Sequence, residues 1–394
     1  MTRDARLFAA GAAIVTLHLV DVVAWRPAVV LALGLLAYRF APATARAALG
    51  LVAAAAAVMG AYLHVLHIRW DGLARTDITG VALFAASALF AAAAVLALLS
   101  RRPLRPARRA VRAVATAAAA IPLLLFAVVP VAVAMWLGGK PRQPLEPASL
   151  PVAHRDVTLR SSDGTKLSGW YVPSRNGGAV VLVHGGGGDR NGVRRHALLL
   201  ARHGYGVLFY DERGRGRSGG ATQSMGWNWV PDVEAAVAYL QAQRGVRRVG
   251  ALGLSTGAEV VVTAAAHDPR IRAVVAEGLI NRNLADSAHQ RTIDDITGLP
   301  YWAVTFAALR VVSGTHPPEA LTDDLRAVAP RPLLVVAAKR NAPERAVAST
   351  WARAAGPTAR LWLADAGHTR ALATHPRLYE RRVTGFFAHA LLSR

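Results

Sequence analysis

The sequence has no cysteine, and only three of its 46 basic residues are lysines. The missing thiols exclude disulfide bonds, thiolate catalysis and cysteine-ligated metal sites. Acidic residues are also scarce, 24 against 46 arginines and lysines, so the formal net charge is +22. The basic residues are scattered through the C-terminal half and cluster only once in the N-terminal half. Because the charge is not focused on one segment, it does not predict a nucleic-acid-binding surface.

Residues 1–137 contain few charged residues and consist mostly of alanine, leucine and valine, whereas residues 152–394 alternate apolar runs with glycine, proline and charge. This division predicts an α-helical membrane bundle followed by a globular domain. Five apolar runs are expected to be transmembrane helices, namely Leu7–Trp25, Pro27–Phe40, Ala47–Leu66, Ile78–Leu99 and Val114–Leu137. The second run is shorter than the roughly 20 residues that cross the hydrocarbon core, so four spans are the alternative.

The loop before the last expected span, Arg101–Arg112, carries six arginines and no acidic residue. Basic loops stay on the cytoplasmic side of a membrane, so this loop is expected inside the cell. With five spans, the chain then emerges outside the cytoplasm after Leu137. Residues 138–151 are rich in proline and are expected to be a stiff linker. We therefore expect a multi-pass protein of the cell membrane with an extracytoplasmic globular domain; its spans hold too few polar residues for a transporter or channel.

In residues 152–394 the pattern changes to short apolar runs that alternate with amphipathic segments. Asp156–Arg160 and Leu167–Val172 are expected to form a hairpin. Further strands are expected at Ala179–His184, Tyr205–Tyr210, Val249–Leu254, Ile271–Ala276, Pro332–Ala338 and Arg360–Leu363. Helices are expected at Val193–Arg202, Asp232–Gln243, Gly257–His267, Glu344–Ala355 and Pro376–Leu392. Such alternation predicts an α/β fold with a mostly parallel, doubly wound sheet that is covered on both faces.

The segment Gly253–Gly257 has the pattern G-x-S-x-G and lies between an expected strand and an expected helix. A serine at such a sharp turn needs small flanking residues, because strand and helix approach each other closely there. The helix that begins at this turn also favours negative charge that develops beside it. Ser255 is therefore the candidate nucleophile.

A second glycine-rich segment, His184–Gly188, follows a buried strand. A run of glycines exposes backbone N–H groups, which is what an oxyanion requires. We assign one oxyanion donor to Gly186 and the other to the N–H of Thr256. A phosphate-binding loop is the competing interpretation, but neither G-x-G-x-x-G nor a G-K-[ST] ending is present. His184 is expected to orient the loop.

These segments, together with Asp211–Gly219 (D-x-R-G-x-G-x-S-G) and Ala366–His368, resemble the α/β-hydrolase superfamily in their order and spacing. The resemblance is greatest to its esterase, thioesterase and serine-aminopeptidase-like members, and it covers about residues 152–394. It implies that His368, in a glycine-preceded loop after the last strand, is the general base. It also implies that the irregular, helical residues 278–330 form a cap over the acyl pocket.

The acid of the expected triad departs from the family pattern. Asn341 stands where the resemblance implies an aspartate, and an asparagine does not stabilise an imidazolium as a carboxylate does. Glu344 lies close by and is the preferred acid. Glu277, at the end of the sixth strand, is the alternative, and a dyad supported by Asn341 is the third possibility.

The expected function is that of a membrane-anchored serine hydrolase that cleaves a carboxylic ester or thioester through an acyl-enzyme. A small-molecule or lipid acyl substrate fits this expectation; no cofactor, metal or nucleic acid is expected. A serine peptidase of the same fold is the first alternative. The second is a catalytically inactive, membrane-tethered binding module.

Overall fold

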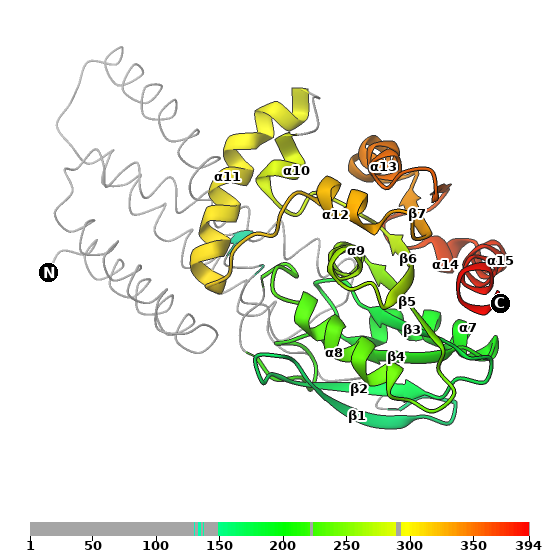
Figure 1. Cartoon of the computed structure of the whole chain (residues 1–394). Coiled ribbons are helices and arrows are strands. Elements are labelled where there is room, and N and C mark those ends of the chain that lie inside the picture. Colours follow the sequence, from blue (N-terminus) through cyan, green and yellow to red (C-terminus); the bar gives the residue numbers. More distant parts are fainter. Residues whose placement is uncertain are drawn as a thin grey trace, which may run out of the picture. The chain divides into compact units, whose positions relative to one another are not determined.

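The computed structural model describes residues 149–220, 224–288 and 293–393, together with residues 130, 133, 134 and 137. Eight strands of this part form one sheet in the order β1-β2-β4-β3-β5-β6-β7-β8 (Figure 1). β2 is antiparallel to both of its neighbours, and the strands from β3 to β8 are all parallel. The strands are β1 Arg155–Arg160, β2 Lys166–Val172, β3 Gly178–Val183, β4 Gly206–Tyr210, β5 Arg248–Leu254, β6 Ile271–Glu277, β7 Leu333–Ala338 and β8 Ala359–Ala364.

Helices cover both faces of the sheet, as the sequence predicted (Figure 1). One face carries α8 (Val230–Gln241), α9 (Thr256–His267), α12 (Leu321–Val328) and α13 (Ala342–Ala354). The other face carries α7 (Arg194–Arg202), α14 (Ala371–Thr374) and α15 (Pro376–Phe387). Successive residues of a strand point to opposite faces, so the residues of β3 from Ala179 to Val183 alternate between two hydrophobic cores.

Each strand and helix predicted between Asp156 and Leu392 is present, and apart from the end of the last helix their ends differ by at most two residues. The expected hairpin is confirmed, with Leu167 opposite Leu159 in an antiparallel register. The last helix changes character near its end, because α15 stops at Phe387 and a π-helical turn, Ala388–Leu392, continues it. The prediction of a mostly parallel α/β sheet is therefore confirmed.

Between β6 and β7 the chain forms three helices: α10 Leu284–Ala288, α11 Ile293–Ser313 and α12. By compactness the chain divides into two units. One comprises Arg142–Leu299 and Ser313–Arg394 and contains the whole sheet, and the other comprises Met1–Pro141 and Pro300–Val312. In α11, the rings of Trp302 and Phe306 stack with centroids 5.5 Å apart.

The five expected membrane spans lie almost entirely outside the described residues. Within the described part of the chain, no helix combines the length and the apolar character needed to cross a bilayer.

Candidate active site

Ser255 lies at the turn between β5 and α9 in a strained backbone conformation, with φ 52° and ψ −127°. A non-glycine residue held at positive φ costs of order 1–3 kcal/mol and persists only where its surroundings enforce it. Here the Ser255 N–H donates to the carbonyl oxygen of Glu277 over 2.8 Å, and the Ala258 N–H donates to that of Ser255 over 2.7 Å. The turn therefore holds the serine at the carboxyl end of the sheet, as its G-x-S-x-G pattern indicated.

Both glycines of the pattern stand where no side chain fits. A Cβ on Gly253 would lie 2.1 Å from the carbonyl oxygen of Gly257, and a Cβ on Gly257 would lie 2.4 Å from that of Val183. Because the clashing atoms belong to the backbone, relief would require moving the strand or the helix. The close approach of β5, α9 and β3 thus depends on these two glycines.

Gly257→Ala is accordingly expected to lower the free energy of unfolding by about 2 kcal/mol or more, since overpacking against backbone atoms has few ways to relax. The control is Gly385→Ala in α15, where a Cβ would meet nothing within 4 Å. That substitution should raise stability by about 0.5–1 kcal/mol, because alanine has the higher helix propensity. Thermal unfolding of the purified full-length variants measures both changes, and equal effects would contradict the packing argument.

His368 connects Ser255 to a buried carboxylate. Its Nε2 lies 2.8 Å from Ser255 Oγ, and its Nδ1 lies 2.5 Å from Glu344 Oε1. The carboxylate accepts from Nδ1–H, so Nε2 is free to accept the serine hydroxyl proton. Glu344 is 1 % exposed, and its Oε2 accepts from the N–H of Ala338 over 2.9 Å. The structure thus brings together Ser255, His368 and Glu344.

The start of α13 explains how Glu344 reaches the imidazole. Asn341 is the N-cap of this helix, and its Oδ1 accepts from the Glu344 N–H over 3.2 Å. An N-cap side chain is occupied with the first turn of its helix. Asn341 therefore caps the helix, and the first-turn Glu344 turns inward from the capped end.

Glu277, the alternative acid, occupies a different position. Its Oε1 accepts from the N–H of Ala371 over 3.1 Å, three residues beyond His368. The next residue, Gly278, has φ 81°, and a Cβ there would lie 2.9 Å from His368 Cε1. Of the two glutamates singled out from the sequence, Glu344 contacts the imidazole and Glu277 contacts the loop that carries it.

The glycine loop after β3 lies against the turn of Ser255. A Cβ on Gly186 would lie 2.9 Å from Thr256 Oγ1, and one on Gly185 would lie 3.3 Å from Ser255 Cβ. The two residues assigned as oxyanion donors, Gly186 and Thr256, are thus neighbours beside Ser255. The assignment of their N–H groups as oxyanion donors stays a prediction.

His184 is buried beneath this loop and bonds only backbone groups in the described structure. Its Nδ1 lies 2.8 Å from the Gly185 carbonyl oxygen, and its Nε2 accepts from the Glu212 N–H over 3.1 Å. Burial lowers the pKa of His184 to about 4, so the imidazole is neutral. Both nitrogens orient the loop, in agreement with the expected role.

Arg215 also holds the loop, and the sequence reasoning missed it. Its guanidinium is 4 % exposed and donates to the Gly186 carbonyl oxygen over 2.7 Å. Burial lowers the pKa of Arg215 to about 10. The D-x-R-G-x-G-x-S-G pattern contained this arginine, but nothing in the pattern indicated which carbonyl it would bind.

Asp211 organises the same segment. Its carboxylate accepts from the Arg190 guanidinium and from the N–H of Arg217, each over 2.8 Å. A Cβ on Gly216, which has φ 43°, would lie 2.2 Å from Asp211 Oδ2. The segment therefore folds tightly around one buried carboxylate and presents Arg215 to the glycine loop.

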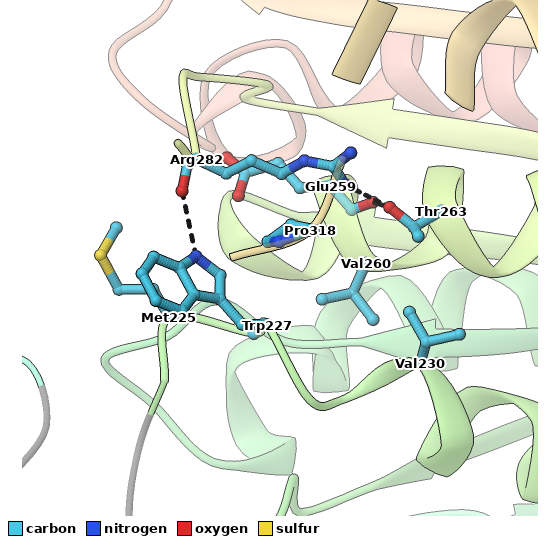
Figure 2. Close-up of a pocket in the computed structure, with 9 residues that line it drawn as sticks. Met225, Trp227, Val230, Glu259, Val260, Thr263, Arg282 and Pro318 are labelled. Atoms are coloured by element: carbon cyan, nitrogen blue, oxygen red, sulfur yellow. Dashed lines mark hydrogen bonds between the residues drawn. The ribbon is translucent and has the colours of Figure 1, made fainter. Parts of the chain in front are cut away.

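A small pocket lies beside α9, one turn beyond Thr256 (Figure 2). Within it, the Trp227 indole N–H donates to the Arg282 carbonyl oxygen over 3.0 Å. Burial raises the pKa of Glu259, in its wall, to about 8. The pocket is lined by Met225, Gly226, Trp227, Val230, Glu259, Val260, Thr263, Arg282 and Pro318.

Among the described residues, no group of three or more histidine, aspartate or glutamate side chains is arranged to hold a metal ion.

Comparison with known proteins agrees with this fold. Residues 174–299 match the Hydrolase_4 family model, described as serine aminopeptidase, S33. The uncharacterized protein Rv2307c of Mycobacterium tuberculosis is 35 % identical in a 167-residue alignment that covers 38 % of this chain and 58 % of that protein. A second M. tuberculosis protein, MT2364, is 38 % identical over 31 % of this chain and 44 % of its own length. The chain thus spans about half the length of these two relatives.

Among solved structures, the Pyrococcus furiosus esterase Pf2001 aligns with a TM-score of 0.52 and 24 % identity, covering 64 % of this chain and 98 % of the esterase. The α/β hydrolase GrgF from Penicillium aligns with a TM-score of 0.50 and 17 % identity, covering 61 % of this chain and all of GrgF. At such identities the likeness concerns the fold. Strand order and structural likeness, together with the family match over residues 174–299, show that the sheet-containing part of this chain has an α/β-hydrolase-like fold.

Proposed function

We propose that this protein is a serine hydrolase that cleaves a carboxylic ester or thioester through an acyl-enzyme, with Ser255 as nucleophile, His368 as general base and Glu344 as the acid of the triad. The observation that carries the proposal is the continuous hydrogen-bond chain from Ser255 Oγ through the imidazole to Glu344. A serine at a strained strand–helix turn, bonded to a histidine that a buried carboxylate orients, is the arrangement that nucleophilic acyl transfer requires.

The reaction follows from these contacts. As Ser255 Oγ attacks the acyl carbon, His368 Nε2 removes its proton, and the negative Glu344 stabilises the imidazolium that forms. The N–H groups of Gly186 and Thr256 are proposed to bind the oxyanion of the tetrahedral intermediate. His368 then gives the proton to the departing alcohol or thiol, and a water molecule activated by the same imidazole releases the acid in the second half of the reaction.

The matched family model is described as serine aminopeptidase, so peptide cleavage is the alternative activity. Ester or thioester cleavage is preferred because none of the site residues described above specifies a peptide amine, and because a membrane anchor would bring lipophilic acyl groups close. The esterase Pf2001 has the same fold. The purified chain should be assayed against p-nitrophenyl esters of graded acyl length, acyl thioesters and aminoacyl anilides. Cleavage of the anilides alone would overturn the ester proposal.

We also propose that residues 1–137 anchor the hydrolase domain to the cell membrane, on its extracytoplasmic side. Support comes from the five apolar runs and from the arginines of Arg101–Arg112. An alkaline phosphatase fused after Arg394 is expected to be active, because that enzyme folds only outside the cytoplasm. The matched control is the same reporter inserted at Pro103–Ala107, which should be inactive. The reverse pattern would mean an even number of spans and would overturn the orientation.

A further inference from the structure

Glu277 contacts both segments that carry the proposed nucleophile and base. It is the last residue of β6, it is 2 % exposed, and it pairs with Leu254, which precedes Ser255. Its backbone carbonyl accepts from the Ser255 N–H over 2.8 Å, while its side-chain Oε1 accepts from the Ala371 N–H over 3.1 Å. Displacing this one residue would therefore shift Ser255 and the His368 loop relative to each other.

The loop that Glu277 holds is itself strained. Thr369, directly after His368, has φ 51°, in the left-handed region that threonine rarely adopts. Such a conformation persists only where surrounding bonds enforce it, and the Ala371 N–H bond to Glu277 is one of them. The side chain of Glu277 thus has a mechanical role at the base of the site.

The second carboxyl oxygen, Oε2, is buried and has no hydrogen-bond partner among the described residues. His196 of α7 faces it at 3.9 Å, and burial lowers the pKa of that imidazole to about 3, so His196 brings no charge. Tyr379 of α15, Glu344 of α13 and His368 are the other titratable groups that act on the carboxyl.

Two carboxyl groups thus flank His368 with unequal support. Glu344 bonds the imidazole and the N–H of Ala338, whereas the carboxyl of Glu277 bonds the N–H of Ala371 and interacts with the Tyr379 hydroxyl. Burial, followed by the influence of the neighbouring Glu344, raises the pKa of Glu277 to about 7. Its proton is therefore lost near neutral pH, where a serine hydrolase needs a neutral base.

Building on the proposed function, we propose that Glu277 is a positioning residue of the hydrolase site. In its neutral form it holds the His368 loop against Ser255. When it ionises, it places a second negative charge beside His368 and makes the imidazole more basic. The site would then contain a carboxyl that adjusts the strength of the base to the surrounding pH.

The test compares the wild-type chain with Glu277→Gln, in which the amide oxygen can still accept from Ala371 but cannot ionise. The rate at which diethyl pyrocarbonate modifies His368, followed against pH by mass spectrometry of its peptide, reports the neutral imidazole whether or not the protein is active. We expect the midpoint for His368 to fall by about one pH unit in Glu277→Gln, because neighbouring unit charges in a partly buried site interact by this order of magnitude. An unchanged midpoint would overturn the proposal.

Two further variants separate charge and positioning from packing. Asp365, three residues before His368, is exposed, and its carboxylate pairs with Arg340 over 3.0 Å. Asp365→Asn should leave the midpoint for His368 unchanged, because solvent screens the charge that it removes. Glu277→Ala removes the carboxyl oxygen that accepts from the Ala371 N–H. The kcat of this variant should fall about tenfold or more with little change in KM. Glu277→Gln keeps an acceptor oxygen, so its kcat at pH 6 should equal that of the wild-type chain. Failure of glutamine to restore kcat in a folded variant would argue against positioning. A shifted midpoint in a chain that a fluorophosphonate does not label would uphold the Glu277 proposal and refute the hydrolase proposal.

Discussion

Ser255→Ala is expected to abolish hydrolysis and covalent labelling while the protein keeps its fold. The hydroxyl is the group that bonds His368 Nε2 at the strained turn, and alanine retains the Cβ that packs there. Removal of a triad nucleophile costs a factor on the order of 10⁴ or more in rate, with residual activity from substrate binding and oxyanion donors. Turnover of an ester substrate and labelling by a fluorophosphonate probe measure the loss.

Ser162→Ala is the matched control, because this serine is exposed in the turn between β1 and β2. It should retain both turnover and labelling. Labelling that persists in Ser255→Ala would show that another serine is the nucleophile. A wild-type chain that neither turns over esters nor reacts with the probe would favour the inactive binding module.

The proposed nucleophile could be found from the sequence because its requirements are local. Gly253 and Gly257 must be small for reasons that lie within a single strand–turn–helix unit, and the contacts at both positions bear this out. The strands could be located for a related reason. Each parallel strand is buried on both faces, so it appears in the sequence as a continuous apolar run.

The choice between Glu344 and Glu277 could not be made in the same way. Glu277 ends one apolar strand and Glu344 follows another. Which of them meets His368 depends on how residues 91 and 24 positions apart in the chain pack together. In the structure Asn341 caps α13, and Glu344 in the first turn of this helix points inward to His368. Sequence reasoning treated Asn341 as a possible member of the site and did not foresee its capping role.

Arg215 illustrates a second kind of omission. It stands among several arginines in one short segment, and residue type alone does not distinguish a surface side chain from one that binds the glycine loop. Burial distinguishes Arg215 from a surface arginine, because it is 4 % exposed and donates to the Gly186 carbonyl oxygen. Long-range hydrogen bonds of this kind leave no periodic pattern in a sequence.

Glu344→Gln is expected to lower kcat by roughly 10⁴-fold. The carboxylate accepts from His368 Nδ1–H and so keeps Nε2 able to accept the serine proton. A glutamine can instead turn its NH₂ group toward Nδ1, which leaves the proton on Nε2 and prevents proton removal from Ser255. The lost negative charge also withdraws support from the imidazolium in the transition state.

Stability controls separate this effect from loss of fold. Glu344→Gln places a group of the same shape beside the Ala338 N–H, so its unfolding free energy should fall by no more than about 1–3 kcal/mol, the cost of one impaired buried hydrogen bond. Asn341→Ala removes the cap and should cost about 1 kcal/mol while most of the rate is retained, because the carboxylate remains. The double variant Ser255→Ala, Glu344→Gln should be no slower than Ser255→Ala alone, since the carboxylate acts only through the imidazole that serves the serine. Near-wild-type turnover by a folded Glu344→Gln would instead mean that Ser255 and His368 work as a dyad without a charged partner.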